Sequence, residues 1–350
     1  MEKCKNAKLM KIVHIVWELN IGGAETMLAD ILNEQVEYGN LHLIVINKAY
    51  DQTIVNSLDN RVNKYFIGRS PGSINLVPIL KLNLAILSIS PDIIHCHNQD
   101  IISILYHRKR KIICTVHGLG RKKKYLEKYN SLISISDTVK MDVMSRINLD
   151  SVRIYNGVKT SAIIMKHDYG KKGTFKILSV GRLIHEVKGQ HVLLRALALL
   201  KNKNIFVDIV GEGPSEDYLS QQITKWELSN IRLLGKKSRD WTYANMNKYD
   251  LIIQPSLSEG FGLVLVESMA AKIPLLVSDI SAHMEILKGA SFGISYRKHD
   301  CHDLASKIEY MVDRNFDLKM LNLARRRVEN KYNIKTTSMK YIGYYKTVIG

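Results

Sequence analysis

The sequence predicts an α/β protein built from two doubly wound domains, each with a parallel β-sheet. The first observation behind this prediction is length, because 350 residues suit two domains of ordinary size, each with its own hydrophobic core. The second is the alternation of short apolar runs with longer helix-like segments along the whole chain. The third is that glycines and polar residues follow several apolar runs directly, at the position where parallel sheets bind ligands.

Short apolar runs mark the predicted strands, and several segments between them are interpreted as helices. In the first half, strands are expected at 11–16, 42–47, 62–67, 91–98, 111–116, 132–135 and 152–155, with helices ending near 38 and at 76–88. In the second half, strands are expected at 175–180, 206–210, 231–234, 249–254 and 274–277, with helices ending near 200 and 229 and at 262–270, 301–312, 316–332 and 335–348. The polar stretch Lys166–Gly173 is interpreted as a linker, so the domains are expected to cover 1–165 and 166–334.

Composition places the chain among ordinary globular proteins, because 46% of its residues are hydrophobic and 24% are charged. No apolar run approaches the ~18 residues that a membrane span needs, and the N-terminal stretch lacks a small-residue cleavage site. Neither a membrane span nor a signal peptide is therefore predicted. The four cysteines form no C-x-x-C pair, which favours a reduced cytosol and argues against a disulfide framework or a zinc site.

The net charge of +18 is large but evenly spread. Residues 1–170 carry 23 Lys and Arg against 15 Asp and Glu, an excess of 8, and residues 171–350 carry 28 against 18, an excess of 10. An even spread indicates general attraction to anionic surfaces, such as lipid headgroups or a diphosphate-linked acceptor. A basic nucleic-acid-binding protein remains the alternative of a different class, although clustered charge with interleaved aromatic residues is missing.

The most informative stretch is Ile252–Asp279, where a short apolar strand leads through a loop into a helix and a second strand. Glu259 lies in the loop and Glu267 in the helix, eight positions apart. Between them, the backbone N–H groups of Phe261-Gly262-Leu263 would form a helix N-terminus, which binds anions. Eight helical residues span roughly 12 Å, comparable to a diphosphate with a sugar at each end. Each carboxylate would then accept hydrogen bonds from sugar hydroxyls on one side of the phosphates.

The segment from Glu259 to Glu267, E-G-F-G-L-V-L-V-E, resembles the E-x7-E signature of the retaining glycosyltransferases of family 4. The match extends over S-E-G-F-G-L-x-x-x-E-x-M-A-x-x-x-P, between two apolar strands. The resemblance implies the GT-B fold, two Rossmann-like doubly wound domains facing a cleft, and metal-independent sugar transfer with retention of configuration. It also implies that Glu259 binds donor-sugar hydroxyls, that Glu267 binds the ribose, and that Phe261, Gly262 and Leu263 lie in the substrate-binding site.

Further motifs of the second half match the same family. Gly181-Arg182-Leu183 follows a strand and Lys188-Gly189 begins a helix, which is another anion-site pattern. By resemblance, Arg182 and Lys188 neutralise the donor diphosphate and stabilise charge on the leaving nucleotide, although this loop is one residue longer than the usual spacing. Gly213, in a G-E-G-P turn, and Gly235, in a loop beside the nucleotide base, are implied to bind the substrate.

In the first half, Gly22-Gly23 joins a strand to a helix, the phosphate-side geometry of a Rossmann unit without its G-x-G-x-x-G fingerprint. Such a pair is also typical of a plain tight turn. The resemblance implies that this loop faces the donor diphosphate and the acceptor. His117, in T-V-H-G, matches the family histidine that approaches the donor sugar, with a structural histidine as the alternative.

The resemblance also carries expectations for the crossings between the two domains. Asn156-Gly157-Val158 resembles the turn at the family's domain crossover, although Lys159 stands where the family usually has Asp. The last helix, 335–350, is implied to pack back on the first domain. Its tyrosines, Tyr341, Tyr344 and Tyr345, are most simply packing residues.

No metal site is predicted. His95 and His97, at i and i+2, would need a further histidine or carboxylate that the sequence does not offer, and no D-x-D pair is placed to hold Mg²⁺. Arg108–Lys111 and Arg121–Lys124 are basic runs on loops. They are interpreted either as solvated faces or as contacts to a lipid-linked acceptor or an anionic membrane.

The predicted function is transfer of a sugar from a nucleotide-diphosphate sugar, with a UDP-sugar favoured over a GDP-sugar, to a glycan or lipid-linked glycan. The expected setting is bacterial surface polysaccharide or lipopolysaccharide biosynthesis, in the cytoplasm or at the cytoplasmic face of the inner membrane. No further cofactor and no nucleic-acid partner are expected. The alternative with the same fold is a sugar-nucleotide epimerase.

Overall fold

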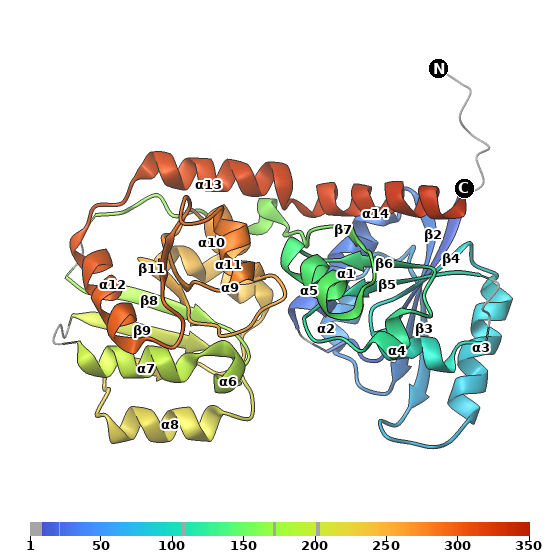
Figure 1. Ribbon diagram of the computed structural model, residues 1–350, viewed down its shortest axis with the longest axis horizontal. Coiled ribbons are helices and arrows are strands. Elements are labelled where there is room, and N and C mark those ends of the chain that lie inside the picture. Colours follow the sequence, from blue (N-terminus) through green and yellow to red (C-terminus); the bar gives the residue numbers. More distant parts are fainter. Residues whose placement is uncertain (1–8, 21, 107–109, 171–172, 201–203) are drawn as a thin grey trace. The chain divides into compact units, whose positions relative to one another are not determined.

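The computed structural model describes residues 9–20, 22–106, 110–170, 173–200 and 204–350. They form two compact units, one of residues 1–157 with 334–350 and the other of residues 158–333. Each unit is a parallel β-sheet with helices, as Figure 1 shows. The expected fold class, two Rossmann-like doubly wound α/β domains, is confirmed.

Unit 1, residues 1–157 with 334–350, contains a sheet of seven parallel strands in the order β3-β2-β1-β4-β5-β6-β7. The strand order reverses between β1 and β4, where neighbouring crossovers leave to opposite sides and a ligand crevice forms in doubly wound sheets. The strands are β1 (Met10–Val16), β2 (Gly39–Asn47), β3 (Asn63–Arg69), β4 (Ile93–Cys96), β5 (Lys111–Val116), β6 (Ser131–Ser134) and β7 (Val152–Arg153).

The helices of unit 1 follow their strands closely in the chain. They are α1 (Gly23–Gln35), α2 (Gln52–Ser57), α3 (Val77–Ile89), η1 (Gln99–Ile104), α4 (Lys123–Leu126), α5 (Asp137–Ile147) and α14 (Ile334–Ile349). The last of these, α14, packs against α1 although 298 residues, 36–333, separate the two helices in sequence. Tyr341 and Tyr345 are fully buried in the core that α14 shares with β1 and β2, and Tyr344 packs against it. All three tyrosines are packing residues, as predicted.

Unit 2, residues 158–333, contains a sheet of six parallel strands in the order β10-β9-β8-β11-β12-β13. Its order reverses between β8 and β11. The strands are β8 (Phe175–Val180), β9 (Ile205–Val210), β10 (Ile231–Leu233), β11 (Leu251–Gln254), β12 (Leu275–Ser278) and β13 (Ile294–Tyr296). Near-continuous apolar sequence explains why most of β11 and β12 is buried on both faces.

Helices cover the second sheet as well. They are η2 (Thr160–Ala162), α6 (His185–Lys188), α7 (Gln190–Leu199), α8 (Glu216–Lys225), α9 (Arg239–Asn245), η3 (Met246–Lys248), α10 (Leu263–Ala270), α11 (Ser281–Leu287), α12 (Cys301–Asp313) and α13 (Leu318–Lys331). A single core joins α7 and α12 to the sheet, through residues such as Leu193, Val207 and Leu304.

The chain passes from one unit to the other between Gly157 and Val158, and returns between Asn333 and Ile334. A Cβ on Gly157 would lie 2.8 Å from Ile334 Cα, so only glycine allows this approach of the two segments. The observed division comes eight residues before the expected one at 165/166. Val158 already belongs to unit 2, because its N–H donates to Tyr332 O at 2.8 Å.

The stretch Lys166–Gly173, predicted to be the linker, lies within unit 2, because the chain crosses between the units at 157/158. Lys166 is buried, and its Nζ pairs with Asp250 Oδ1 at 3.0 Å. Tyr169 donates from its hydroxyl to Lys272 O at 2.8 Å. The polar sequence does not reveal this packing, because the carboxylate that allows Lys166 to be buried lies 84 positions later in the sequence. Residues 171 and 172 lie outside the described residues.

Candidate functional sites at the two switch points

The predicted site residues of unit 2 follow the carboxyl ends of its strands. Two loops leave the sheet where its order reverses, Gly181–Leu183 after β8 and Pro255–Glu259 after β11. Gly181 donates its N–H to Val210 O at 2.9 Å. A Cβ on Gly181 would lie 3.6 Å from Gln254 Nε2 and 3.8 Å from Lys188 Cδ, so the two loops are close neighbours. This is the crevice position of doubly wound sheets.

Gly189, in the turn between α6 and α7, fixes how this turn meets the loop after β11. Its φ is +68°, and a Cβ there would lie 1.9 Å from Pro255 O, so no other residue fits. Beside it, Leu257 donates its N–H to Val187 O at 2.8 Å. The backbone contacts therefore hold the turn before α7 against the loop after β11.

The result of this docking is an ion pair between two predicted catalytic residues. Lys188 Nζ lies 2.5 Å from Glu259 Oε1, with side chains 22% and 14% exposed. Ser256 donates from Oγ to the same carboxylate oxygen at 2.9 Å. Burial alone would raise the pKa of Glu259, but the charge and hydrogen bond of Lys188 outweigh it and hold this pKa below its usual value. Glu259 is therefore a carboxylate at neutral pH, able to accept hydrogen bonds from hydroxyls.

Arg182 lies on the same loop with its side chain exposed. Gln190 donates from Nε2 to Arg182 O at 3.0 Å, which holds the backbone in place. Within the described part of the chain, the guanidinium has no hydrogen-bond or ion-pair partner. A fixed backbone with an unpaired guanidinium is suited to binding an anion bidentately.

Gly213 and Gly235 shape the neighbouring loops. A Cβ on Gly213 would lie 2.5 Å from Leu183 O, and Leu183 donates its N–H to Glu212 O at 2.9 Å. The glycine turn thus supports the loop that carries Arg182. Gly235 has a φ of +64° and accepts at its carbonyl from Gly211 N at 3.0 Å.

The predicted helix N-terminus is present at α10. Gly262 is its N-cap with a φ of +116°, and Leu263 is its first residue. Phe261 is buried, with its ring edge-on to Tyr332 at 5.7 Å between centroids, and it anchors the entry to the helix. Glu267 lies one turn further along and is 8% exposed. The first N–H groups of α10 have no partner within the helix, so this end presents donors.

His283 is a residue of this site that the sequence analysis did not select. It lies on α11, and its Nδ1 is 3.1 Å from Ser278 Oγ. A Cβ on Gly262 would lie 3.6 Å from its ring. Burial lowers the pKa of His283 to about 4, so the ring is neutral. The sequence offers only a histidine five residues after the end of β12, and such a position alone is a weak sign of a site residue.

In unit 1 the corresponding loops leave the sheet after β1 and β4. Trp17 joins them, donating from Nε1 to Asp100 Oδ1 at 2.9 Å and from its backbone N–H to Asn98 Oδ1 at 3.1 Å. Gly22 is the N-cap of α1, and Gly23 is the first residue of that helix. The expected strand, glycine turn and helix are therefore all found at this switch point. Ile21 lies outside the described residues.

A hollow of about 280 Å³ lies at the carboxyl ends of β4 and β5. Its lining includes His97, Asp100, His117, Arg121 and Lys122. His117, chosen from sequence, and Arg121, from the second basic run, thus line one polar hollow. The first basic run is different, because Arg110 donates to Pro91 O and Ser90 Oγ and so closes the end of α3. Arg108 and Lys109 lie outside the described residues.

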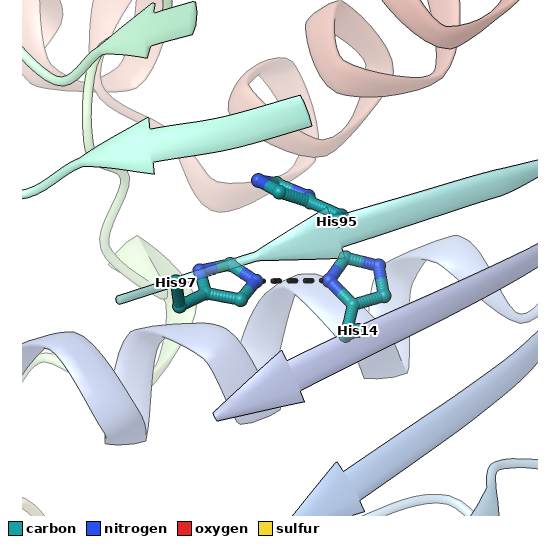
Figure 2. A group of neighbouring side chains, drawn as sticks. All are labelled: His14, His95 and His97. Carbon is teal, nitrogen blue, oxygen red and sulfur yellow. Dashed lines mark hydrogen bonds between the residues drawn. The ribbon is translucent and has the colours of Figure 1, made fainter. Parts of the chain in front are cut away.

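Three histidines of unit 1 form a hydrogen-bonded chain. His14 Nδ1 lies 3.0 Å from His97 Nε2, and His97 Nδ1 lies 3.2 Å from His117 Nε2. Figure 2 shows His14 and His97 with facing nitrogens and His95 beside them. Burial lowers the pKa of His14 to about 3 and of His117 to about 4, and it holds the pKa of His95 and His97 well below the usual value. All four rings are therefore neutral. Among the described residues, neither outer nitrogen of the chain, His14 Nε2 or His117 Nδ1, has a hydrogen-bond partner.

The statement that His95 and His97 lack a third ligand is wrong. His14, on β1, brings its ligand atom within 4.8 Å of theirs, because β1 and β4 are adjacent and His14 is the register partner of His95. Neutral imidazoles are suited to a transition metal. However, His14 and His97 point nitrogens at each other, and both His95 nitrogens lie 2.7 Å from hydroxyls, of Tyr345 and Thr115. A metal would have to displace these hydrogen bonds, and the arrangement is accounted for as a hydrogen-bonded cluster.

Comparison with known proteins decides the family. The model described as Glycosyltransferase Family 4 matches residues 21–162, and the model described as Glycosyl transferases group 1 matches residues 163–333. The chain belongs to the family 4-type glycosyltransferases. Its structure adds that this glycosyltransferase has the GT-B architecture of two Rossmann-like units. Glycosyl transfer is thus supported over the epimerase and the nucleic-acid-binding protein.

Individual relatives of this glycosyltransferase cover most of the chain. An uncharacterized glycosyltransferase of Methanocaldococcus jannaschii is 27% identical over 96% of this chain and 98% of its own. An O-antigen biosynthesis glycosyltransferase of Escherichia coli, WbnH, is 28% identical over 87% of this chain and 89% of its own. Among solved structures, Anabaena HepE in complex with UDP and glucose superposes with a TM-score of 0.80 at 20% identity, covering 97% of this chain and 100% of that one.

The helices can also be compared with the length and hydropathy of a membrane span. None of those in the described part of this glycosyltransferase is both long and apolar enough to cross a membrane.

Proposed function

We propose that this glycosyltransferase transfers a sugar, with retention of configuration, from a nucleotide-diphosphate sugar bound at the β8/β11 switch point of unit 2. The observation that carries the proposal is the group of Arg182, Lys188 and Glu259 beside the N-terminus of α10. Two cations and a helix N-terminus supply countercharge for a diphosphate, and a buried carboxylate supplies an acceptor for sugar hydroxyls.

In the proposed reaction, charge develops on the leaving nucleotide diphosphate. Arg182 and Lys188 would stabilise this charge without a bound metal, since a fixed guanidinium and an ammonium supply the positive charge that Mg²⁺ supplies elsewhere. Glu259 would orient the donor sugar, and Glu267 would bind the ribose. Lys188 and Glu259 are paired with each other in the structure, so donor binding exchanges part of this ion pair for contacts with the ligand.

On the acceptor side we propose a glycan or lipid-linked glycan, in bacterial surface polysaccharide or lipopolysaccharide biosynthesis. Support comes from the E. coli relative, whose name assigns it to O-antigen biosynthesis. The hollow beside His117 has Arg121 and Lys122 in its lining, as a phosphate-bearing acceptor requires. His117 offers an unpartnered nitrogen of a neutral imidazole chain to a sugar hydroxyl.

The donor is proposed to be a UDP-sugar, and the first experiment tests its base. Thermal unfolding is measured with UDP, GDP, ADP, TDP and CMP in the presence of a chelator. A nucleotide that binds the folded state raises the melting temperature by mass action. We expect UDP to give the largest rise; a larger rise with GDP would reassign the base, and no rise with any nucleotide would contradict a donor site at β8/β11.

Two exposed arginines of unit 2 provide a matched control for this experiment. Arg182→Ala removes the guanidinium at the switch point, whereas Arg195→Ala removes the same charge from the exposed side of α7. The UDP-induced rise should shrink in the first variant and persist in the second. Equal losses would show that net charge alone attracts the nucleotide.

A further inference from the structure

Helix α3 is apolar on two sides, but the sheet buries only one of them. Leu82, Ile86 and Ile89, spaced i, i+4, i+7, are buried, and the helix contacts β3 and β2 at the edge of the sheet. Leu80, Leu84 and Leu87 repeat the same spacing and are 54% to 57% exposed. At 3.6 residues per turn the exposed leucines form a continuous stripe along the helix.

The exposed stripe continues into the residues before it. Val77 is 54% exposed, Leu76 69% and Ile74 95%. We define the α3 face as the six residues Ile74, Leu76, Val77, Leu80, Leu84 and Leu87. Exposed apolar residues that recur along one side of a helix are suited to an interaction surface.

Cations flank the α3 face, and the nearest acidic residue in the sequence beyond its C-terminal end is Asp92. The segment from Gly68 to Pro91 contains two basic residues, Arg69 and Lys81, and no Asp or Glu. Lys81 is exposed on α3 itself. Arg69 donates to Ser73 O at 2.7 Å, near the start of the helix, and Arg110 donates to Ser90 Oγ at 2.9 Å, at its end. Cations therefore lie at both ends and along one side of the apolar face.

We propose that the α3 face docks on an anionic lipid membrane, with its leucines at the boundary between headgroups and acyl chains. The surrounding cations would then contact lipid phosphates, which is the composition of an interfacial amphipathic helix. A second copy of the chain is a poorer occupant, because a symmetric contact would bring the same cations together. The inference deepens the proposed function, since it gives the surface through which an enzyme with a lipid-linked acceptor reaches its substrate.

The test is co-sedimentation of the full chain with phosphatidylcholine vesicles, with and without phosphatidylglycerol. The double variant Leu80→Gln/Leu84→Gln removes two central residues of the face and keeps good helix formers. The control, Leu318→Gln/Leu323→Gln, makes the same change at two leucines of α13 that are 52% and 54% exposed. We expect the partition coefficient of the α3 double variant on anionic vesicles to be at least roughly tenfold lower than that of the wild type. The control variant should have the partition coefficient of the wild type.

Each other outcome has a defined meaning. Wild-type partition by the α3 double variant would overturn the proposal, and so would equal loss in the control. Equal binding to vesicles with and without phosphatidylglycerol would overturn the assignment to an anionic surface. A wild-type dimer in sedimentation that the α3 variant loses would assign the face to a second copy. The proposed donor site is tested separately, by UDP-induced thermal stabilisation of the wild-type protein without vesicles. Absence of that stabilisation would count against the donor site and not against the docking of the α3 face on a membrane.

Discussion

The two switch points share a backbone plan but differ in the chemistry that fills it. In unit 1 the floor of the site is a chain of neutral imidazoles, those of His14, His97 and His117, and charged side chains such as Arg121 lie at its edge. In unit 2 it is built from charges, the Lys188–Glu259 pair and Arg182, whose guanidinium has no partner among the residues that the structure describes. The difference teaches that a doubly wound sheet provides only the position of a site, and that the loop side chains decide whether it suits a hydroxyl or a diphosphate.

The loops are also held in different ways. In unit 1, a side chain joins them, because Trp17 donates to both Asp100 and Asn98. In unit 2, backbone contacts at Gly189 join them. Perturbing one anchor at a time therefore tests whether each unit keeps its own site.

The largest effect is expected from Gly189→Ala. Its Cβ would overlap Pro255 O at 1.9 Å in a positive-φ conformation, so the variant should lose roughly 2–4 kcal/mol of stability and most of its UDP response. The control is Gly289→Ala, where φ is +65° and a Cβ meets nothing within 4 Å; backbone strain alone costs about 1–2 kcal/mol there. Urea unfolding and UDP-dependent melting measure both. Equal behaviour of the two variants would contradict the close docking of the loops.

Next in size is the effect of Arg182→Ala on donor affinity. A lost hydrogen bond to a charged group is worth about 1.5–3 kcal/mol, so the dissociation constant of UDP should rise roughly 10- to 150-fold. Titration calorimetry measures it. His97→Asn in unit 1 should leave the UDP dissociation constant within about twofold of the wild-type value. A loss of affinity as large as that of Arg182→Ala would contradict the assignment of UDP binding to unit 2 alone.

Mild acid should then weaken unit 1 more than unit 2. The folded pKa of His14 is lowered to about 3 by burial, below its usual value near 6.5, so the unfolded chain binds the extra proton and stability falls as pH drops below about 6.5. At pH 5 this costs about 2 kcal/mol for His14 alone. The pKa of Glu259 is also lowered, but a carboxylate with a lowered pKa loses its contribution only below about 4.5.

Hydrogen exchange followed by mass spectrometry resolves the two units in this experiment. After correction for intrinsic rates, peptides of β1, β4 and β5 should lose protection between pH 7 and 5, and those of β8 and β11 much less. The switch point of unit 2 contributes one such histidine, His283. Uniform loss over both sheets would contradict the assignment of acid sensitivity to the histidine chain.

The smallest effect is expected from Trp17→Phe. It removes the hydrogen bond to Asp100 and should cost about 1 kcal/mol. Local hydrogen exchange at the ends of β1 and β4 should rise, while UDP-induced stabilisation stays unchanged. A changed UDP response would mean that the loops of unit 1 influence the donor site.

Sequence predicted the parts of the site that depend on local order. The strand, glycine loop and helix around Glu259 follow from neighbouring residues, and α10 begins at Leu263, one position from the expected start. His14 could not be selected, because its role depends on β1 lying beside β4, which is a pairing about 80 positions apart in sequence. The burial of Lys166 could not be predicted for the same reason, since the carboxylate that allows it comes from Asp250.

Residues whose role depends on strand order or on contacts between distant backbone segments could therefore not be predicted from the sequence. Gly189 was noted as part of a helix start, but the contact that requires glycine there is made by Pro255, on another strand's loop. The roles of Glu267 and His117 toward a ligand stay predictions, to be tested by the nucleotide experiments above.

The return of the chain to unit 1 has a consequence for synthesis on the ribosome. Unit 2 is complete at Asn333, whereas unit 1 still lacks α14, whose Tyr341 and Tyr345 fill its core and whose Tyr345 lies within hydrogen-bond distance of His95. Domains generally fold as the N-terminal one emerges first. Residues up to 157 therefore leave the ribosome long before α14, and the core of unit 1 is completed only after the whole of unit 2 has been synthesised.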